Sequence, residues 1–286
     1  MPELPEVEIV RRGLKAKIIG ETVREVEIFR EQSIGYPKPK KFTALLTGRT
    51  FTDVSRRGKY LLLHLDNNDK TEQAYLVVHL RMSGRLLLDD KEMKKRQSKF
   101  LRVRMMLNSG RLLYFEDMRV FGRLCYVSSA ADLAKAIPSF SQLGIEPLES
   151  VTASQLLSLF KNSRRAIKTA LLDQTLIAGI GNIYADEILF QTGIHPLKLA
   201  GRITDKQAKQ LTQIIPDTLK RAIERGGSSI KDFVDSEGVN GNYQHEAMVY
   251  GRTGKPCRKC KSLIERLKIS GRSAHFCPVC QKRVRG

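Results

Sequence analysis

The stretch CRKCKSLIERLKISGRSAHFCPVC, residues 257–280, decides the fold of the C-terminal part of this chain. It contains two Cys-x2-Cys pairs separated by sixteen residues, the spacing of a tetrahedral zinc site in which each pair supplies two thiolates. The intervening residues are enough for a β-hairpin, with Gly271 near its tip. Two disulfides are the alternative, but the N-terminus shows no secretory pattern and a reducing compartment keeps thiols free. We therefore expect one zinc ion, bound by Cys257, Cys260, Cys277 and Cys280.

The expected zinc site is structural rather than catalytic. Four thiolates complete the coordination sphere and leave no position for water or substrate. Because so short a segment buries little core, the metal would supply most of its folding free energy. The fifth cysteine, Cys125, stands alone in an apolar run at 124–127 and is typical of an inert core residue.

The chain is strongly basic, with 50 Lys and Arg against 30 Asp and Glu and a net charge of +20. Residues 251–286 carry eleven of the basic residues and a single acid, so half of the net charge lies in this segment. Basic side chains displace condensed counterions from phosphates, which makes a polyanion the expected partner. A solvated basic tail would have the same composition, but the four cysteines favour a DNA-binding finger.

Length and composition predict a multidomain protein without a membrane span. The 286 residues are enough for two or three domains, and the hydrophobic content of 41% is ordinary for a globular chain. No run of 18 apolar residues occurs. The segment MPELPEVEIVRRG has acids where a secretory signal places basic residues. We expect a cytoplasmic protein.

Residues 1–130 are predicted to form an antiparallel β-sandwich opened by a helix. Val7, Val10, Leu14 and Ile18 recur at helical spacing within 6–19. Short β-rich runs follow, separated by turn signals, as is typical of a sandwich. The predicted strands are 23–29, 50–54, 60–65, 74–80, 85–88, 100–107, 111–115 and 123–127. Residues 131–150 are expected to be a linker with a short helix.

Residues 151–246 are predicted to be helical and residues 247–286 to form the zinc finger. Thr152 can cap a helix to about residue 160, 165–172 is helical in pattern, and Thr204-x-x-Gln207 has capping-box form. After Gly226-Gly227, some twenty residues without periodicity indicate a long mobile loop. Gly179-x-Gly181-Asn182 predicts a tight turn and a helix capped by Asn182. Such an N-terminus can bind phosphate, although an ordinary capped helix has the same sequence pattern.

Three segments together resemble the bacterial formamidopyrimidine-DNA glycosylase family: MPELPEVE at residues 1–8, the turn and helix at 179–187, and the four-cysteine tail. The likeness runs along the whole chain in order, and the PELPEVE start differs from the PEGPE-type start of the endonuclease VIII branch. The resemblance implies a β-sandwich, a helix–two-turns–helix domain and a zinc finger, with damaged double-stranded DNA between the two halves. It also implies a monomeric base-excision repair enzyme of the bacterial cytosol, associated with the nucleoid through DNA. Such an enzyme removes 8-oxoguanine and formamidopyrimidines and then cleaves the abasic strand by β,δ-elimination.

The resemblance also implies roles for single residues. The catalytic group would comprise Pro2, Glu3, Lys59 and Arg272; the DNA-binding group His79, Arg119 and Asn182; and the wedge that fills the gap left by an extruded base Met82, Arg119 and Phe121. From spacing alone, Met82 and Phe121 at strand ends are more typical of core residues than of a wedge. Two departures from the family pattern are visible, since Arg81 stands where some relatives have glycine and Met118 where proline is frequent. Residues 228–243 match the family's lesion-covering loop in placement and only loosely in sequence.

An N-terminal amine suits the implied chemistry. At pH 7 a lysine with a pKa near 10.4 is about 0.04% free base, whereas an α-amine with a pKa near 7.8 is about 10–15% free base. A proline amine that attacks C1′ leaves an iminium ion, which allows strand cleavage by elimination, and Glu3 could act as the acid and base. This requires removal of Met1. The alternatives are a helix lead-in at Pro2 and Glu3 and a catalytically silent DNA-binding module.

Overall fold

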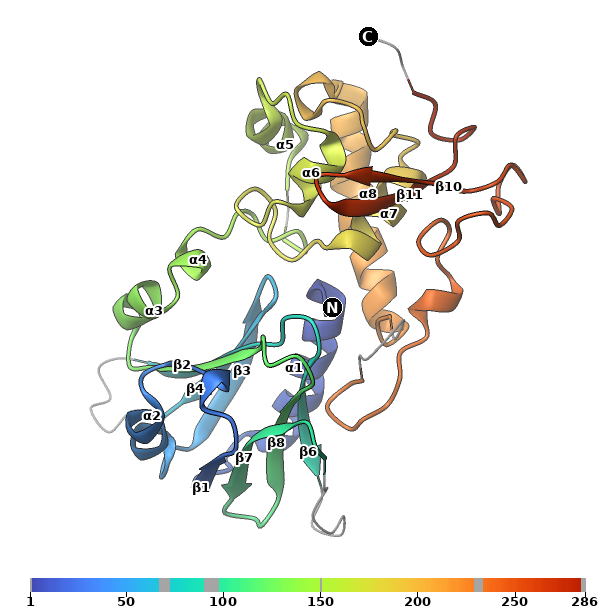
Figure 1. Cartoon of the computed structure of the whole chain (residues 1–286). Helices are drawn as coiled ribbons and strands as arrows, with labels where there is room; N and C mark the ends of the chain where they lie inside the picture. Colours follow the sequence, from blue (N-terminus) through green and yellow to red (C-terminus); the bar gives the residue numbers. More distant parts are fainter. Residues whose placement is uncertain (1, 67–72, 90–97, 150, 229–233, 284–286) are drawn as a thin grey trace. The chain divides into compact units, whose positions relative to one another are not determined.

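The computed structural model describes residues 2–66, 73–89, 98–149, 151–228 and 234–283 (Figure 1). Contacts within the chain divide it into two units. Unit 1 comprises Met1–Gln142 and Gly226–Asn242, and unit 2 comprises Leu143–Arg225 and Tyr243–Gly286. The two units are described separately below. The domain boundaries expected from the sequence at 130, 150 and 246 stay predictions.

Unit 1 contains a leading helix, nine strands among its described residues and three short helices. Its helices are α1 (Leu4–Ile18), α2 (Pro39–Leu46), α3 (Ala130–Ala136) and α4 (Pro138–Ser141), with a 3-10 turn η1 (Glu31–Ser33). Its strands are β1 (Val23–Ile28), β2 (Ile34–Tyr36), β3 (Phe51–Arg57), β4 (Tyr60–Leu65), β5 (Ala74–His79), β6 (Gly84–Asp89), β7 (Leu101–Leu107), β8 (Leu112–Asp117) and β9 (Arg123–Val127).

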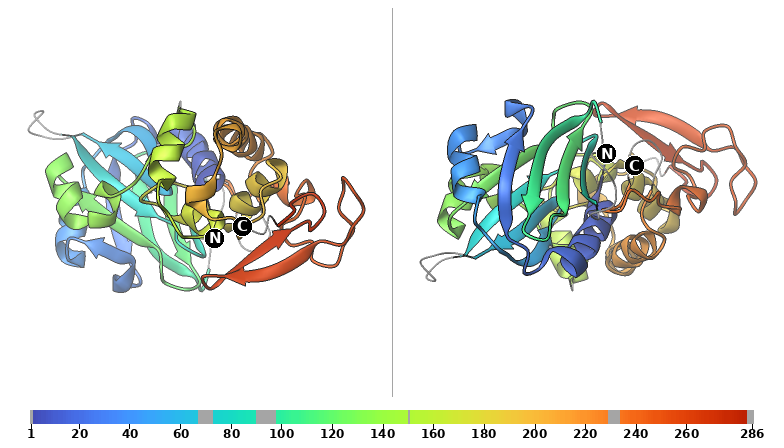
Figure 2. Two further views of the ribbon diagram at one scale, coloured as in Figure 1. Left: turned by 90° about the horizontal axis from the view of Figure 1, so that it is seen from above. Right: turned by 90° about the horizontal axis from the view of Figure 1, so that it is seen from below.

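These strands form two sheets that share one apolar core. The strand order is β1-β7-β8-β6 in one sheet, with β1 beside β7 in the right view of Figure 2, and β2-β9-β5-β4-β3 in the other. The predicted sandwich is therefore confirmed, and all pairs are antiparallel except the short β2–β9 pair. The four apolar positions expected to face inward on α1 are all buried. Helix α1 begins at Leu4 rather than Glu6, because Glu3 and Glu6 form a capping box at its start.

Strand β2 and helix α2 were not expected from the sequence and lie between the first two predicted strands. Strand β2 has only three residues, too few for alternation to be visible. Helix α2 has eight residues and buries Phe42 and Leu46 against the core. Its helical identity depends on this packing, since an isolated helix of that length is marginal in water.

Unit 2 contains four helices among its described residues and the C-terminal hairpin. The helices are α5 (Ala153–Phe160), α6 (Ile167–Leu172), α7 (Asn182–Gln191) and α8 (Asp205–Glu224), with 3-10 turns η2 (Ala200–Arg202) and η3 (Tyr243–His245), and the strands are β10 (Glu265–Ile269) and β11 (Arg272–Phe276). The caps expected at Thr152 and Thr204 are confirmed as capping boxes. The described helices include none that is long and apolar enough to cross a membrane.

The segment after α8 belongs to unit 1, on the surface of the sandwich. Gly226 and Gly227 both have positive φ, which glycine adopts without strain, and α8 ends just before them. Ser236 accepts a hydrogen bond from the Leu88 amide at 2.9 Å, and Lys17 forms a 2.9 Å ion pair with Glu237. Five residues of the predicted lesion loop, 229–233, lie outside the described residues.

Candidate functional site

The register of the five-stranded sheet brings several predicted site residues to one end of the sandwich. Arg57 pairs with Tyr60 across the turn Gly58-Lys59, Tyr60 pairs with His79, and His79 pairs with Arg123. The turn that carries Lys59 and the loops 80–83 and 118–122 therefore all lie at the same end of the strands. We call this end the loop end of unit 1.

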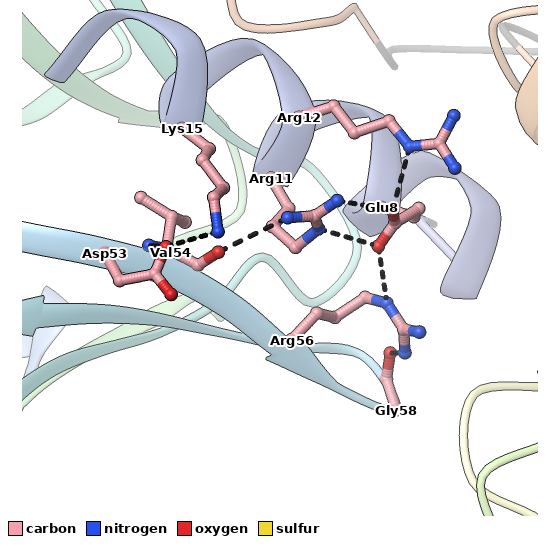
Figure 3. Close-up of polar contacts among 8 residues, drawn as sticks. All are labelled: Glu8, Arg11, Arg12, Lys15, Asp53, Val54, Arg56 and Gly58. Atoms are coloured by element: carbon pink, nitrogen blue, oxygen red, sulfur yellow. Dashed lines mark hydrogen bonds and ion pairs between the residues drawn. The ribbon is translucent and has the colours of Figure 1, made fainter. Parts of the chain in front are cut away.

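The N-terminus of α1 points toward the same loop end. Figure 3 shows α1 beside β3, with Lys15 contacting Asp53 at 2.6 Å and Glu8 contacting Arg56 at 3.2 Å. The side chain of Arg56 also donates to the carbonyl oxygen of Gly58 at 2.9 Å. Because α1 begins four residues before Glu8 and runs antiparallel to β3, its start lies further toward the end of β3 that leads into the Lys59 turn. Glu8 and Arg56 thus join the helix that carries Pro2 to the turn that carries Lys59.

Glu8 is held as a carboxylate by three arginines. Burial by itself would raise its pKa, but hydrogen bonds from Arg11 and Arg12 and the charges of Arg11 and Arg56 outweigh it and lower the pKa of Glu8 to about 2. Sequence reasoning did not single out Glu8 or Arg56. They lie 48 positions apart, and only the observed packing of α1 on β3 brings them together.

The first residues of the chain are enclosed rather than extended into solvent. Pro2 is buried, and Glu3 and Glu6 expose 2% and 1% of their surface. The Glu3 amide donates to Glu6 Oε2 at 2.8 Å, while Glu6 Oε1 accepts from the Ser228 amide at 2.8 Å. The helix lead-in considered for Pro2 and Glu3 is therefore present. It is compatible with chemistry, because it also orders the residue that would carry the amine.

His79 closes β5 beside the Lys59 turn. Its ring meets the Tyr60 ring edge-on at 4.5 Å, and Nδ1 accepts a hydrogen bond from the Arg81 amide at 3.0 Å. Burial, followed by the charges of Arg81 and Lys59, lowers the pKa of His79 to about 3. A neutral ring whose Nδ1 is an acceptor carries its proton on Nε2, so it can donate one hydrogen bond to a phosphate.

We expect His79 to stay neutral between pH 5 and 8. Its pKa in the folded state lies below the ordinary value of 6.5, so its stabilising contribution is complete above pH 6.5 and is lost as pH falls toward 3. Nuclear magnetic resonance of the His79 ring, assigned with His79→Gln, should show no titration near pH 6.5. The stability advantage over His79→Gln should fall by up to about 1.4 kcal/mol per pH unit below that value. A ring that titrates near pH 6.5 would contradict the prediction.

The two loops that carry the predicted wedge differ in how far they expose their side chains. Phe121 exposes 49% of its surface, so it is not a core residue, and the Arg119 guanidinium lies 4.7 Å from the centre of its ring. Met82 is partly buried in the neighbouring loop. Arg81, which stands where some relatives have glycine, has φ 54°, in the left-handed region that favours glycine. That departure from the family pattern therefore costs backbone strain.

In unit 2, Asn182 is the first residue of α7, and the cap is Gly181. The expectation that Asn182 caps this helix was wrong, because the preceding glycines place the extended cap conformation one residue earlier. Gln174 orders this turn: its Oε1 accepts from the Gly179 amide at 2.8 Å and its Nε2 donates to the Ile180 carbonyl at 2.9 Å. The side-chain oxygen of Asn182 is buried and has no hydrogen-bond partner among the described residues, which leaves it available to a ligand or water.

Arg272 begins β11, directly after a hairpin turn in which Ser270 and Gly271 both have positive φ. This strand packs against α7 (Figure 1). Asp186 of α7 accepts from the His275 amide at 2.9 Å and pairs with the buried Lys168 at 2.5 Å. The strand that begins at Arg272 is therefore anchored to the helix that begins at Asn182. Sequence reasoning missed Asp186, whose partner in the hairpin is 89 positions away.

The four C-terminal cysteines form one compact sulfur cluster. Their Sγ atoms all lie within 4.8 Å of one another, with Cys257 4.0 Å from Cys280 and Cys260 3.4 Å from Cys277. A tetrahedron with zinc–sulfur bonds of about 2.3 Å has sulfur–sulfur distances of about 3.8 Å. The donor set therefore fits one structural zinc ion, and the predicted ligands and hairpin are confirmed. Gln281 anchors the cluster, donating to the Ile194 carbonyl and accepting from the Cys277 amide, both at 2.9 Å.

Family models match three consecutive parts of the chain. The formamidopyrimidine-DNA glycosylase N-terminal domain matches residues 1–124, the H2TH domain of the same enzyme matches 143–234, and a zinc finger found in FPG and IleRS matches 254–283. The formamidopyrimidine-DNA glycosylase of Gloeobacter violaceus is 44% identical over 285 residues, which are 99% of this chain and 98% of the relative. That of Thermosynechococcus vestitus is 44% identical over 283 residues, 98% of this chain and 97% of the relative.

The chain belongs to the formamidopyrimidine-DNA glycosylase family. Solved structures agree: a Lactococcus lactis FPG mutant with a Fapy-dG containing DNA has a TM-score of 0.88 at 34% identity, covering 99% of this chain and 100% of that one. The Lactococcus lactis Fpg with an abasic site containing DNA has a TM-score of 0.87 at 34% identity, covering 98% and 100%. The enzyme class expected from the sequence, a DNA glycosylase with lyase activity, is thereby confirmed.

Proposed function

We propose that this glycosylase removes oxidised purines, 8-oxoguanine and formamidopyrimidines, from duplex DNA through a Schiff base on Pro2. The observation that carries the proposal is the loop end of unit 1. The proposal is supported by the sheet register, which brings the Lys59 turn, His79 and the two loops that hold Met82, Arg119 and Phe121 to one end, and by the ion pair of Glu8 with Arg56, which directs the start of α1 toward that end. Base extrusion and attack at C1′ require a nucleophile, a cation, a neutral group that donates a hydrogen bond to phosphate, and a wedge.

In the proposed reaction the lone pair of the Pro2 nitrogen forms a bond to C1′ as the glycosidic bond breaks, and the base leaves with a proton that balances the one lost from the Pro2 amine. Glu3 protonates the ring oxygen, the sugar opens, and the nitrogen becomes an iminium ion. The iminium acidifies the C2′ protons, so loss of one proton expels the 3′ phosphate. A second elimination expels the 5′ phosphate, and water releases the enzyme from the Schiff base. Glu3 is buried at 2% exposure and directly follows the residue that would carry the amine, which supports its role as the acid.

The remaining candidates would hold the DNA. Lys59 and Arg272 would contact phosphates beside the lesion, together with the His79 Nε2 proton and the Asn182 side chain. A base extruded from the stack leaves a gap that Met82, Arg119 and Phe121 would fill. One DNA site per chain favours a monomer, and a substrate in the nucleoid favours a cytoplasmic enzyme. The zinc ion would act only by folding the finger that presents Arg272.

Borohydride trapping on two lesion duplexes, one with 8-oxoguanine and one with dihydrouracil, tests this proposal. On the 8-oxoguanine duplex we expect a covalent adduct whose mass is the sum of enzyme and DNA, attached to the peptide that begins at Pro2. On the dihydrouracil duplex we expect a much lower yield of this adduct. Preference for dihydrouracil would refute the oxidised-purine assignment. Tight binding to both duplexes without any adduct would instead support the catalytically silent module.

A further inference from the structure

Asp117, the last residue of β8, is a fully buried acid at the loop end of unit 1. Its Oδ1 accepts from the Ser83 hydroxyl at 2.6 Å and from the Arg119 amide at 3.1 Å. Its Oδ2 accepts from the Gly122 amide at 2.7 Å. The Ser83 oxygen in turn accepts from the Arg119 amide at 3.1 Å. One carboxylate therefore holds both loops that carry the proposed wedge.

The two loops run side by side between the same pair of sheets. Loop 80–83 leads from β5 to β6 and loop 118–122 leads from β8 to β9. Their ends are paired on both sides, with His79 opposite Arg123 in one sheet and Gly84 opposite Asp117 in the other. The hydrogen bonds of Asp117 lie between these two paired ends and connect the loops to each other.

Both loops contain backbone that must be held in place. Arg81 has φ 54° and Val120 has φ 55°, a region that is strained for residues with a side chain and persists only where the surroundings enforce it. At Gly122 an added Cβ would lie 2.6 Å from the Phe115 ring and 3.1 Å from Asp117 Oδ2. A side chain at position 122 would therefore force the Phe115 ring to shift and would crowd the carboxylate.

We propose that Asp117 is a positioning residue that makes the Met82 loop and the Arg119–Phe121 loop a single rigid wedge. In the proposed complex Met82 enters the DNA from one loop and Arg119 and Phe121 from the other, so the two loops must keep a fixed relative position for the wedge to fill one gap. The shared carboxylate fixes this position, because it cannot shift toward one loop without breaking its hydrogen bonds to the other. This inference rests on the proposed function, since it presupposes that these three side chains act as a wedge.

Asp117→Asn tests the proposal with little change in shape. The amide can satisfy the donors of Ser83 and Arg119 only by turning its NH2 group toward the Gly122 amide, which is also a donor. Misplaced wedge loops should lower excision of 8-oxoguanine from duplex DNA by about tenfold to a hundredfold. Cleavage of a preformed abasic site in single-stranded DNA needs no wedge and should stay within about twofold. A 2-aminopurine opposite the lesion should show less unstacking.

Ser83→Ala is the milder variant, because it leaves the carboxylate and removes one shared hydroxyl. It should lower duplex excision by about fivefold and carries the test if thermal unfolding shows that Asp117→Asn folds poorly. Ser55→Ala is the matched control: it removes a serine hydroxyl of β3 that contacts His64 of β4 at 2.6 Å, and it should leave duplex excision unchanged.

A double-mutant cycle with Phe121→Ala decides between a positioning role and a general structural one. If the loops form one wedge, Asp117→Asn adds little to the loss already caused by Phe121→Ala. Additive losses, or equal losses on duplex lesion and single-stranded abasic DNA, would overturn the positioning role. If Phe121→Ala alone leaves duplex excision unchanged, the wedge itself fails and the inference with it. Loss with Phe121→Ala but none with Asp117→Asn or Ser83→Ala would refute only the role of Asp117.

Discussion

A chain that retains Met1 is expected to form no covalent adduct with lesion DNA, whereas the same chain beginning at Pro2 forms one. With Met1 in place the Pro2 nitrogen is an amide, which has no lone pair available for attack on C1′. We expect the rate of trapping to fall by at least about a thousandfold, as is typical when a covalent nucleophile is removed. Borohydride reduction followed by intact-mass analysis measures the adduct and the state of the N-terminus in one experiment.

The appropriate control keeps an N-terminal amine but changes the ring. Pro2→Gly supplies a primary amine in the same position, so a slower but measurable adduct is expected. Affinity for the lesion duplex should stay within about threefold in all three proteins, because each keeps one N-terminal amine and the same basic side chains for phosphate binding. If the chain that retains Met1 forms the adduct at a normal rate, the nucleophile is not Pro2, and the α-amine of Met1 and then the amine of Lys59 would be the alternatives to examine.

Features that depend on residues close together in the sequence could be predicted. The zinc ligands follow from two Cys-x2-Cys pairs, the caps at Thr152 and Thr204 from residues three positions apart, and α1 from its apolar spacing. The sandwich follows from short β-rich runs that are separated by turn signals. In each case the physical cause acts over a few residues, so the pattern is visible without the fold.

Features that depend on tertiary packing could not be predicted. Asp117 and Ser83 are 34 positions apart and Glu8 and Arg56 are 48 apart, and nothing in either local sequence indicates a partner. The error at Asn182 has a similar origin, since two neighbouring residues were both suitable caps and the surrounding turn selected Gly181. The sequence therefore indicated the side chains proposed for chemistry but not those that hold them in position.

We expect the DNA affinity of this protein to depend on its metal, because the proposed DNA contact Arg272 belongs to the finger that the metal folds. Arg272 lies on a hairpin whose far end runs into Cys277 and Cys280, and the apolar cluster around these ligands contains few residues, among them Phe190, Val249 and Ile264. So small a core does not fold a finger unaided. Without the metal, helix α7 would remain, but strand β11 would keep only its contacts with α7 and would lose the support of the cysteine cluster that follows it.

Removing the zinc is therefore expected to abolish specific DNA binding before unit 1 unfolds. Structural zinc contributes roughly 10 kcal/mol or more to the folding of comparable fingers, so Cys277→Ser should leave the hairpin unfolded and lower affinity by at least about a hundredfold, with Arg272 no longer held. Cys125→Ser is the matched control, because this thiol lies in β9 of the sandwich and burial raises its pKa to about 11. Zinc content, fluorescence anisotropy with lesion DNA and thermal unfolding would be compared in the two variants. Normal affinity in zinc-free Cys277→Ser, or equal zinc loss in Cys125→Ser, would contradict this dependence.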